Sequence, residues 1–244
     1  MSLTGPTRPT WVFLSDLHVG DGSGADDFGP SPQPSPGGRG QGEGGRADCD
    51  LIAFCARARA RRDRVVVVGD LFDLWQTGLA DIEKAHGEAI EALMEVLYYY
   101  VAGNHDWDML ERRFFGVRAV PLLIEDGILV MHAHQVDPEV AKWPKTARAV
   151  SGVVGFFERF VHHDFDRWAE GVEGWFSRTG RHGQNRRYIA PLSRLAIEHG
   201  CHSVVFGHTH RFAIGLMGPM GLMVSNCGTW TDGHRDCLSL GGAV

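Results

Sequence analysis

The sequence lacks the features that mark membrane, secreted and disulfide-rich proteins. No apolar stretch approaches the ~18 residues of a membrane-spanning helix, and the N-terminus has no signal-peptide core. The five cysteines form no C-x-x-C pair, and an odd number cannot all be bridged. We therefore expect a cytoplasmic protein whose cysteines are free, buried thiols.

An excess of positive charge is also missing. The net charge of −6 gives no general reason to expect nucleic-acid binding. With 244 residues, 43% of them hydrophobic and 22% charged, the chain can bury one large core. We expect residues 1–244 to form a single α/β domain.

The chain does contain an apolar run that ends in a carboxylate. Four consecutive valines at 65–68 lead into Gly69 and Asp70, which is typical of a strand buried on both faces. Ligands of open α/β sheets bind beyond the carboxyl ends of the strands. A single aspartate at such a place is more often a turn or helix-cap residue, so its repetition elsewhere decides the interpretation.

The same pattern recurs in four other segments, at residues 11–18, 98–106, 128–134 and 203–210. The potential metal ligands at the five strand ends are Asp16, His18, Asp70, Asn104, His132, His208 and His210. Seven ligands suit two ions that share one carboxylate, since zinc takes about four ligands and an octahedral ion about six. Asp70, on the central strand, is the natural bridge. A donor set without thiolate suits Mn²⁺, Fe²⁺ or Zn²⁺.

These strings resemble the ordered motifs of the calcineurin-like metallophosphoesterases: DLH at 16–18, GDLFD at 69–73, GNHD at 103–106, HAH at 132–134 and GHTH at 207–210. The resemblance implies a four-layer αββα sandwich of two mixed β-sheets. It also implies how two divalent ions are held, with Mn²⁺ expected and Fe²⁺ or Zn²⁺ as alternatives. The ligands of one ion would be Asp16, His18 and His210, those of the other Asn104, His132 and His208, and Asp70 would bridge them. Ala133 departs from the family, which usually has Gly there.

The expected reaction is hydrolysis of a phosphoester or pyrophosphate bond. A hydroxide that bridges the two ions would attack phosphorus in line, and both ions would stabilise the charge on the phosphoryl oxygens. His105, backed by Asp106, is expected to protonate the leaving group. Asp73 is expected either to hold a ligand histidine or to cap the helix that follows.

Two insertions interrupt the pattern. Residues 30–45 contain ten Pro or Gly in sixteen positions and are expected to form a flexible surface segment. Residues 138–187 are expected to form a cap of two amphipathic helices, with Phe156 and Phe160 widening the apolar arc of the first. Residues 139–188 carry nine Lys or Arg against six Asp or Glu, a net +3, which leaves −9 for the rest of the chain. Either the helices only pack on the domain, or they bind an anionic substrate with an apolar group at the inner membrane surface.

The substrate is expected to be a small anionic phosphoester. The GDLFDLW string at 69–75 and the helical insertion resemble the UDP-2,3-diacylglucosamine pyrophosphatases, whose substrate is lipid-linked. That branch usually has Arg at the position of His105 and HGD instead of HAH, so the chain resembles a less specialised relative. The alternative enzyme is a general phosphodiesterase acting on nucleotides, and a non-catalytic scaffold is the alternative of another class.

Overall fold

The computed structural model describes residues 9–23, 26–29, 46–137, 183–231 and 233–241. The expected flexible segment 30–45 lies outside these residues, as does the expected cap up to residue 182.

The first of two β-sheets has four strands in the order β3-β2-β1-β9. Its strands are β1 (Trp11–Leu14), β2 (Arg64–Val68), β3 (Leu97–Val101) and β9 (Leu238–Leu240). β1, β2 and β3 run parallel, and β9 pairs antiparallel with β1. The valine run of β2 is buried on both faces, which explains why its sequence does not alternate between apolar and polar residues.

The second sheet has five strands in the order β4-β5-β6-β8-β7. Its strands are β4 (Leu123–Glu125), β5 (Ile128–Met131), β6 (Ser203–Phe206), β7 (Ala213–Met217) and β8 (Met223–Asn226). The three central strands are parallel, whereas β4 and β7 are antiparallel to their neighbours. Both sheets are therefore mixed, as expected.

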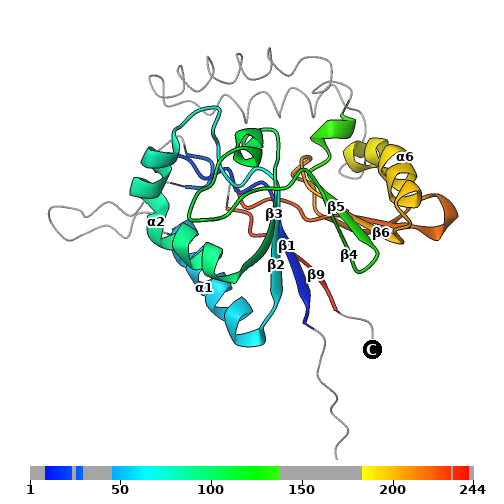
Figure 1. The fold of residues 1–244 in the computed structure, drawn as a ribbon, viewed down its shortest axis with the longest axis horizontal. Helices are drawn as coiled ribbons and strands as arrows, with labels where there is room; N and C mark the ends of the chain where they lie inside the picture. The colour runs from blue at the N-terminus through cyan, green and yellow to red at the C-terminus, as the bar shows by residue number, and fades with distance from the viewer. Residues whose placement is uncertain (1–8, 24–25, 30–45, 138–182, 232, 242–244) are drawn as a thin grey trace, which may run out of the picture.

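The helices and sheets are arranged in four layers (Figure 1). Among the described residues, three hydrophobic clusters fill the space between these layers. Helices α1 (Arg46–Arg61) and α2 (Leu79–Val96) pack on the outer face of the first sheet, and α6 (Gly183–Glu198) packs on the second. Between the sheets, Phe13 and Val68 of the first share a cluster with Val205 of the second. The expected αββα fold is confirmed.

Two expectations need correction. α6 begins at Gly183, so residues 183–187, expected at the end of the cap, form the start of a helix that packs on the second sheet. All five cysteines are free, but Cys49 and Cys237 are exposed, so the expectation of five buried thiols is wrong. Within the described ranges, no helix is both long and apolar enough to cross a membrane.

Candidate metal centre

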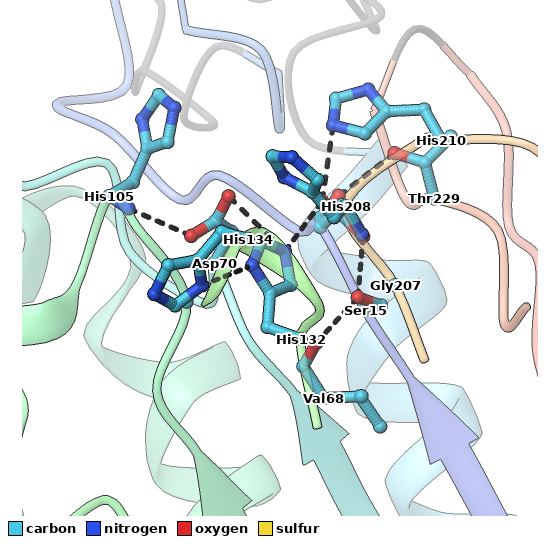
Figure 2. A network of polar contacts seen from close by, with 12 residues as sticks. Ser15, Val68, Asp70, His105, His132, His134, Gly207, His208, His210 and Thr229 are labelled. Atoms are coloured by element: carbon cyan, nitrogen blue, oxygen red, sulfur yellow. Dashed lines mark hydrogen bonds and ion pairs between the residues drawn. The ribbon is translucent and has the colours of Figure 1, made fainter. Parts of the chain in front are cut away.

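The sequence-predicted ligands lie where parallel strands end, on facing edges of the two sheets. Asp16 and His18 follow β1, Asp70 follows β2, and Asn104 follows β3. In the second sheet, His132 follows β5, and His208 and His210 follow β6. Figure 2 shows several of these side chains gathered above the strand ends.

Left-handed backbone conformations are concentrated at these positions. The φ value is 54° at Asp16, 48° at His18, 49° at Asp70, 73° at His208 and 51° at His210. Such values are uncommon for residues other than glycine, and each costs of order 1–3 kcal/mol. The folded chain therefore stores backbone strain at five of the seven predicted ligands, which is typical of a functional site.

The donor atoms of these residues form linked groups. Asp16, His18 and His210 make one group within 4.8 Å of one another, and Asp16, Asp70 and His132 make another. The His132 Nε2 atom is 3.1 Å from Asp16 Oδ1 and 3.4 Å from Asp70 Oδ2. The His210 Nε2 atom is 3.2 Å from Asp16 Oδ1, and His18 Nε2 is 3.8 Å from Asp70 Oδ2. The carboxylates of Asp16 and Asp70 thus lie within 4 Å of the imidazoles of His18, His132 and His210.

Asn104 and His208 are the two remaining predicted ligands. The Asn104 Oδ1 atom is buried and has no hydrogen-bond partner among the residues that the structure describes, although an orphaned buried acceptor costs about 1–3 kcal/mol. The His208 backbone N–H donates to Asp16 Oδ2 at 3.0 Å, so its loop is attached to the centre. A buried amide oxygen without a hydrogen-bond partner suits a hard or borderline divalent cation.

The electrostatics of the cluster also fit a cation. Burial acts to raise the pKa of Asp16, but His210 and His132 outweigh it and hold that pKa well below its usual value. Burial, followed by the charges of Asp106 and Asp16, raises the pKa of Asp70 well above its usual value. Burial lowers the pKa of His132 to about 4, which keeps the imidazole in the neutral form that binds metal. A divalent ion would stabilise both buried carboxylates in their charged form.

His105 stands at the edge of the cluster with its ring held on two sides. Its Nδ1 atom is 2.9 Å from Asp73 Oδ1, and its ring stacks on Trp75 with centroids 3.9 Å apart and planes 20° apart. Its backbone N–H donates to Asp70 Oδ1 at 2.8 Å. The His105 side chain is 18% exposed, so part of the ring faces solvent. Asp73 therefore contacts His105, and the N-cap of α2 is Gly78.

Asp106 has a different role from the expected one. Its Oδ2 atom accepts from the N–H groups of Leu71 and Phe72 and from Tyr100 Oη, and its Oδ1 atom accepts from the N–H of Gly103 at 2.7 Å. The carboxylate thus joins the loops after β2 and β3 beneath the cluster. We correct the expectation that Asp106 backs His105, because Asp73 occupies that place.

Two glycines allow the loops to approach the carboxylates. A Cβ atom at Gly103 would overlap Asp70 Oδ1, and one at Gly207 would overlap Ser15 Oγ and lie 2.8 Å from Asp16 Oδ2. Ser15 Oγ itself donates to Val68 O at 2.8 Å and contacts Asp16 Oδ2. These positions admit only glycine.

A second layer of residues holds the ligand loops, and the sequence did not reveal it. The Asp16 carbonyl accepts from Trp230 N–H at 3.1 Å and from Thr229 Oγ1 at 2.9 Å, so the segment after β8 supports a ligand. The His132 Nδ1 atom is 3.2 Å from His134 Nδ1, a contact drawn in Figure 2. Burial lowers the pKa of His134 to about 2, so this imidazole remains neutral. The two rings flank Ala133, which adopts the left-handed φ of 84° that the usual glycine would adopt without strain.

These residues define a site suited to a metal-dependent hydrolase, and comparison with known proteins gives the family. Residues 10–212 match the family model for calcineurin-like phosphoesterases. The chain belongs to this family. It is therefore a phosphoester hydrolase, and its family implies binding of two divalent metal ions and a small phosphoester substrate.

Two solved structures are similar to the chain. One is a dimetal phosphatase from Danio rerio, with 13% identity, coverage of 96% of this chain and 92% of that one, and a TM-score of 0.48. The other is a conserved uncharacterized protein, a predicted phosphoesterase, from Streptococcus pneumoniae TIGR4, with 14% identity, coverage of 91% and 72%, and a TM-score of 0.35. At these values neither structure bears on the substrate of this chain. No curated protein matches the sequence.

Proposed function

We propose that the chain hydrolyses phosphoester or pyrophosphate bonds with the aid of two divalent metal ions held at the candidate metal centre. One observation carries this proposal: two buried carboxylates, Asp16 and Asp70, lie within reach of imidazoles from both sheets. Such ions, when bound, supply an activated water and neutralise charge on the phosphoryl oxygens.

The proposed ligands of the first ion are Asp16, His18 and His210, whose donor atoms already form one group. The proposed ligands of the second ion are Asn104, His132 and His208. Asp70 is the proposed bridge, because its carboxylate belongs to a group with His18 and also to a group with His132. The unsatisfied Asn104 Oδ1 atom supports its place in the second set. We propose Mn²⁺ as the metal, with Fe²⁺ or Zn²⁺ as alternatives, since no thiolate belongs to these groups.

We propose His105 as the general acid. Its Nδ1 atom faces Asp73, so Nε2 is the nitrogen left to carry a proton to the leaving-group oxygen. Asp73 fixes the ring orientation, while the stacked Trp75 restricts the ring to one plane. Asp106 contributes indirectly, by fixing the loop that carries Asn104 and His105.

For the substrate we propose a small phosphoester, with a UDP-diacylglucosamine-like lipid precursor as the specific candidate. The support is the GDLFDLW string and the basic, aromatic composition of residues 139–188, most of which lie outside the described residues. In this proposal the insertion contacts acyl chains at the inner membrane surface. A general phosphodiesterase acting on nucleotides is the alternative, favoured by His105 where the lipid enzymes usually have Arg.

Metal analysis combined with a bis(aryl) phosphate assay tests the reaction class. We expect about two transition-metal ions per chain and hydrolysis that disappears on chelation and returns with Mn²⁺. Metal-loaded protein without hydrolytic activity would instead support the scaffold. A parallel assay of UDP-2,3-diacylglucosamine, its deacylated counterpart and a cyclic nucleotide tests the substrate. Preference for either unacylated compound would contradict the lipid candidate while leaving the reaction class intact.

A further inference from the structure

Asp137 contacts a predicted metal ligand from outside the cluster. Its Oδ2 atom is 3.2 Å from His208 Nε2. The carboxylate is buried, with 4% of the side chain exposed, whereas the His208 side chain is 14% exposed. Burial of a carboxylate is costly unless hydrogen bonds satisfy it. The contact with His208 supplies one such hydrogen bond.

Two residues of α6 hold Asp137 in place. The hydroxyl of Tyr188 donates to Asp137 Oδ2, and Arg187 Nη2 donates to the same atom at 3.2 Å. Tyr188 is 1% exposed and packs in the cluster between α6 and the second sheet. The position of the Asp137 carboxylate is therefore tied to the packing of α6 on the second sheet.

The contact has a consequence for the chemistry of His208. A carboxylate only accepts hydrogen bonds, so the ring must carry its proton on Nε2. In the neutral imidazole this leaves Nδ1 as the unprotonated nitrogen, which is the form a metal requires. Metal-binding histidines usually donate their other N–H in this way, and loss of the acceptor typically costs 10–100-fold in metal affinity.

We propose that Asp137 is a positioning residue that sets His208 to bind its metal ion through Nδ1, and that Arg187 and Tyr188 anchor this carboxylate to α6. This inference rests on the proposed metal centre. It assigns to α6 a role in the metal site, although none of the seven predicted ligands lies on that helix.

The chain offers a matched control in a carboxylate–histidine pair that contains none of the predicted ligands. Asp48 Oδ1 is 2.9 Å from His86 Nδ1, and both side chains are buried. Asp48→Asn thus weakens a buried carboxylate–histidine pair that has no proposed role in metal binding. A loss of affinity caused only by general destabilisation would appear in both variants.

The test measures binding of Mn²⁺ to the metal-free full chain by calorimetry. We expect two ions in the wild type, one of them bound about 10–100-fold more weakly in Asp137→Ala. Asp137→Asn should lose less, because its amide oxygen can still accept from Nε2. Asp48→Asn should bind both ions as tightly as the wild type. Wild-type affinity for both ions in Asp137→Ala, or an equal loss in Asp48→Asn, would overturn the inference.

A second measurement does not depend on the folding of a variant. Nitrogen NMR of the metal-free wild type distinguishes the two tautomers of His208, and we expect the proton on Nε2. A proton on Nδ1 would overturn the inference. A wild type that binds no Mn²⁺ would instead remove the proposed metal centre, so the two failures are distinguishable.

Discussion

The His105 ring is held by Asp73, whose Oδ1 atom lies 2.9 Å from His105 Nδ1. Asp73 follows Asp70 by three residues, so the end of β2 supplies both the proposed bridging carboxylate and the partner of the proposed general acid. The burial of Asp73 acts to raise its pKa, but the hydrogen bond and charge of His105 outweigh this and lower it. Asp73 is therefore a carboxylate at neutral pH that orients the His105 ring.

The first prediction concerns this pair. His105→Ala should keep both metal ions and lose about two to four decades of kcat on substrates with poor leaving groups. Asp73→Asn should show the same dependence on the leaving group but a smaller loss, about 10–100-fold, because the imidazole remains. The measurement is kcat for a series of aryl phosphodiesters. Equal losses on activated and poor leaving groups would remove the general-acid assignment.

Loss of Asp70, the proposed bridging ligand, should weaken the binding of both metal ions. Asp70→Ala removes the carboxylate shared between the donor groups of His18 and His132, so we expect the purified variant to retain neither ion. Asp108→Asn, which changes a partly exposed carboxylate paired with Arg112 on the protein surface, is the matched control and should keep both. Elemental analysis after dialysis makes the measurement. One tightly bound ion in Asp70→Ala would mean that Asp70 is not the bridge.

A methyl group at Gly207 should disrupt the centre through packing alone. Gly207→Ala places a Cβ atom against Ser15 Oγ and Asp16 Oδ2, so we expect a loss of about 1–3 kcal/mol in the free energy of unfolding and weaker metal binding. Gly87→Ala is the control, since its Cβ would meet Glu83 at an ordinary 3.9 Å within α2, and it should stabilise by about 0.5–1 kcal/mol. Urea denaturation of both variants tests this. A neutral Gly207→Ala would contradict the tight approach of the two loops.

The strands were predictable because their signal is local. The valine run at 65–68 is typical of a doubly buried strand, and the observed strand Arg64–Val68 contains the whole run and one residue before it. The polar residues after five such strands converge because parallel strands place their carboxyl ends on one edge. The start of α6 was missed because residues 183–188 are mostly polar and show no clear apolar period. The burial of Tyr188 results from its packing on Phe206, which the local sequence does not indicate.

The partners of the ligands could not be predicted in the same way. Asp73 and Asp106 both lie in the predicted motifs, and the sequence does not show which of the two contacts His105. The answer depends on loop geometry, which brings Asp106 to three backbone N–H groups instead. Asp137 follows the HAH string by only three residues, but its contact with His208 spans 71 positions and passes through the packing of α6. Side-chain pairs between distant loops leave no periodic trace in a sequence.

The last prediction concerns a buried ion cluster that contains none of the proposed ligands. His86 lies within α2 with non-helical φ and ψ of −128° and 17°, and its two ring nitrogens face Asp48 Oδ1 at 2.9 Å and Asp26 Oδ2 at 3.0 Å. Burial acts to lower the pKa of His86, but hydrogen bonds to Asp26 and Asp48 outweigh it and raise that pKa to about 9. The imidazolium therefore joins the 26–28 loop to α1 and α2.

The sign of the pH dependence follows from this direction. Because the folded-state pKa exceeds the ordinary value of 6.5, the cluster contributes its full stabilisation below about pH 6.5 and loses it as pH rises through about 9. We expect the free energy of unfolding to fall by about 1–3 kcal/mol across this window. In Asp48→Asn the remaining pair with Asp26 raises the pKa less, so the fall should be smaller and should end at lower pH. Urea denaturation between pH 6 and pH 10, with the variant subtracted from the wild type, isolates this contribution from other titrating groups. Parallel curves for the two proteins would show that His86 is not protonated in the folded state.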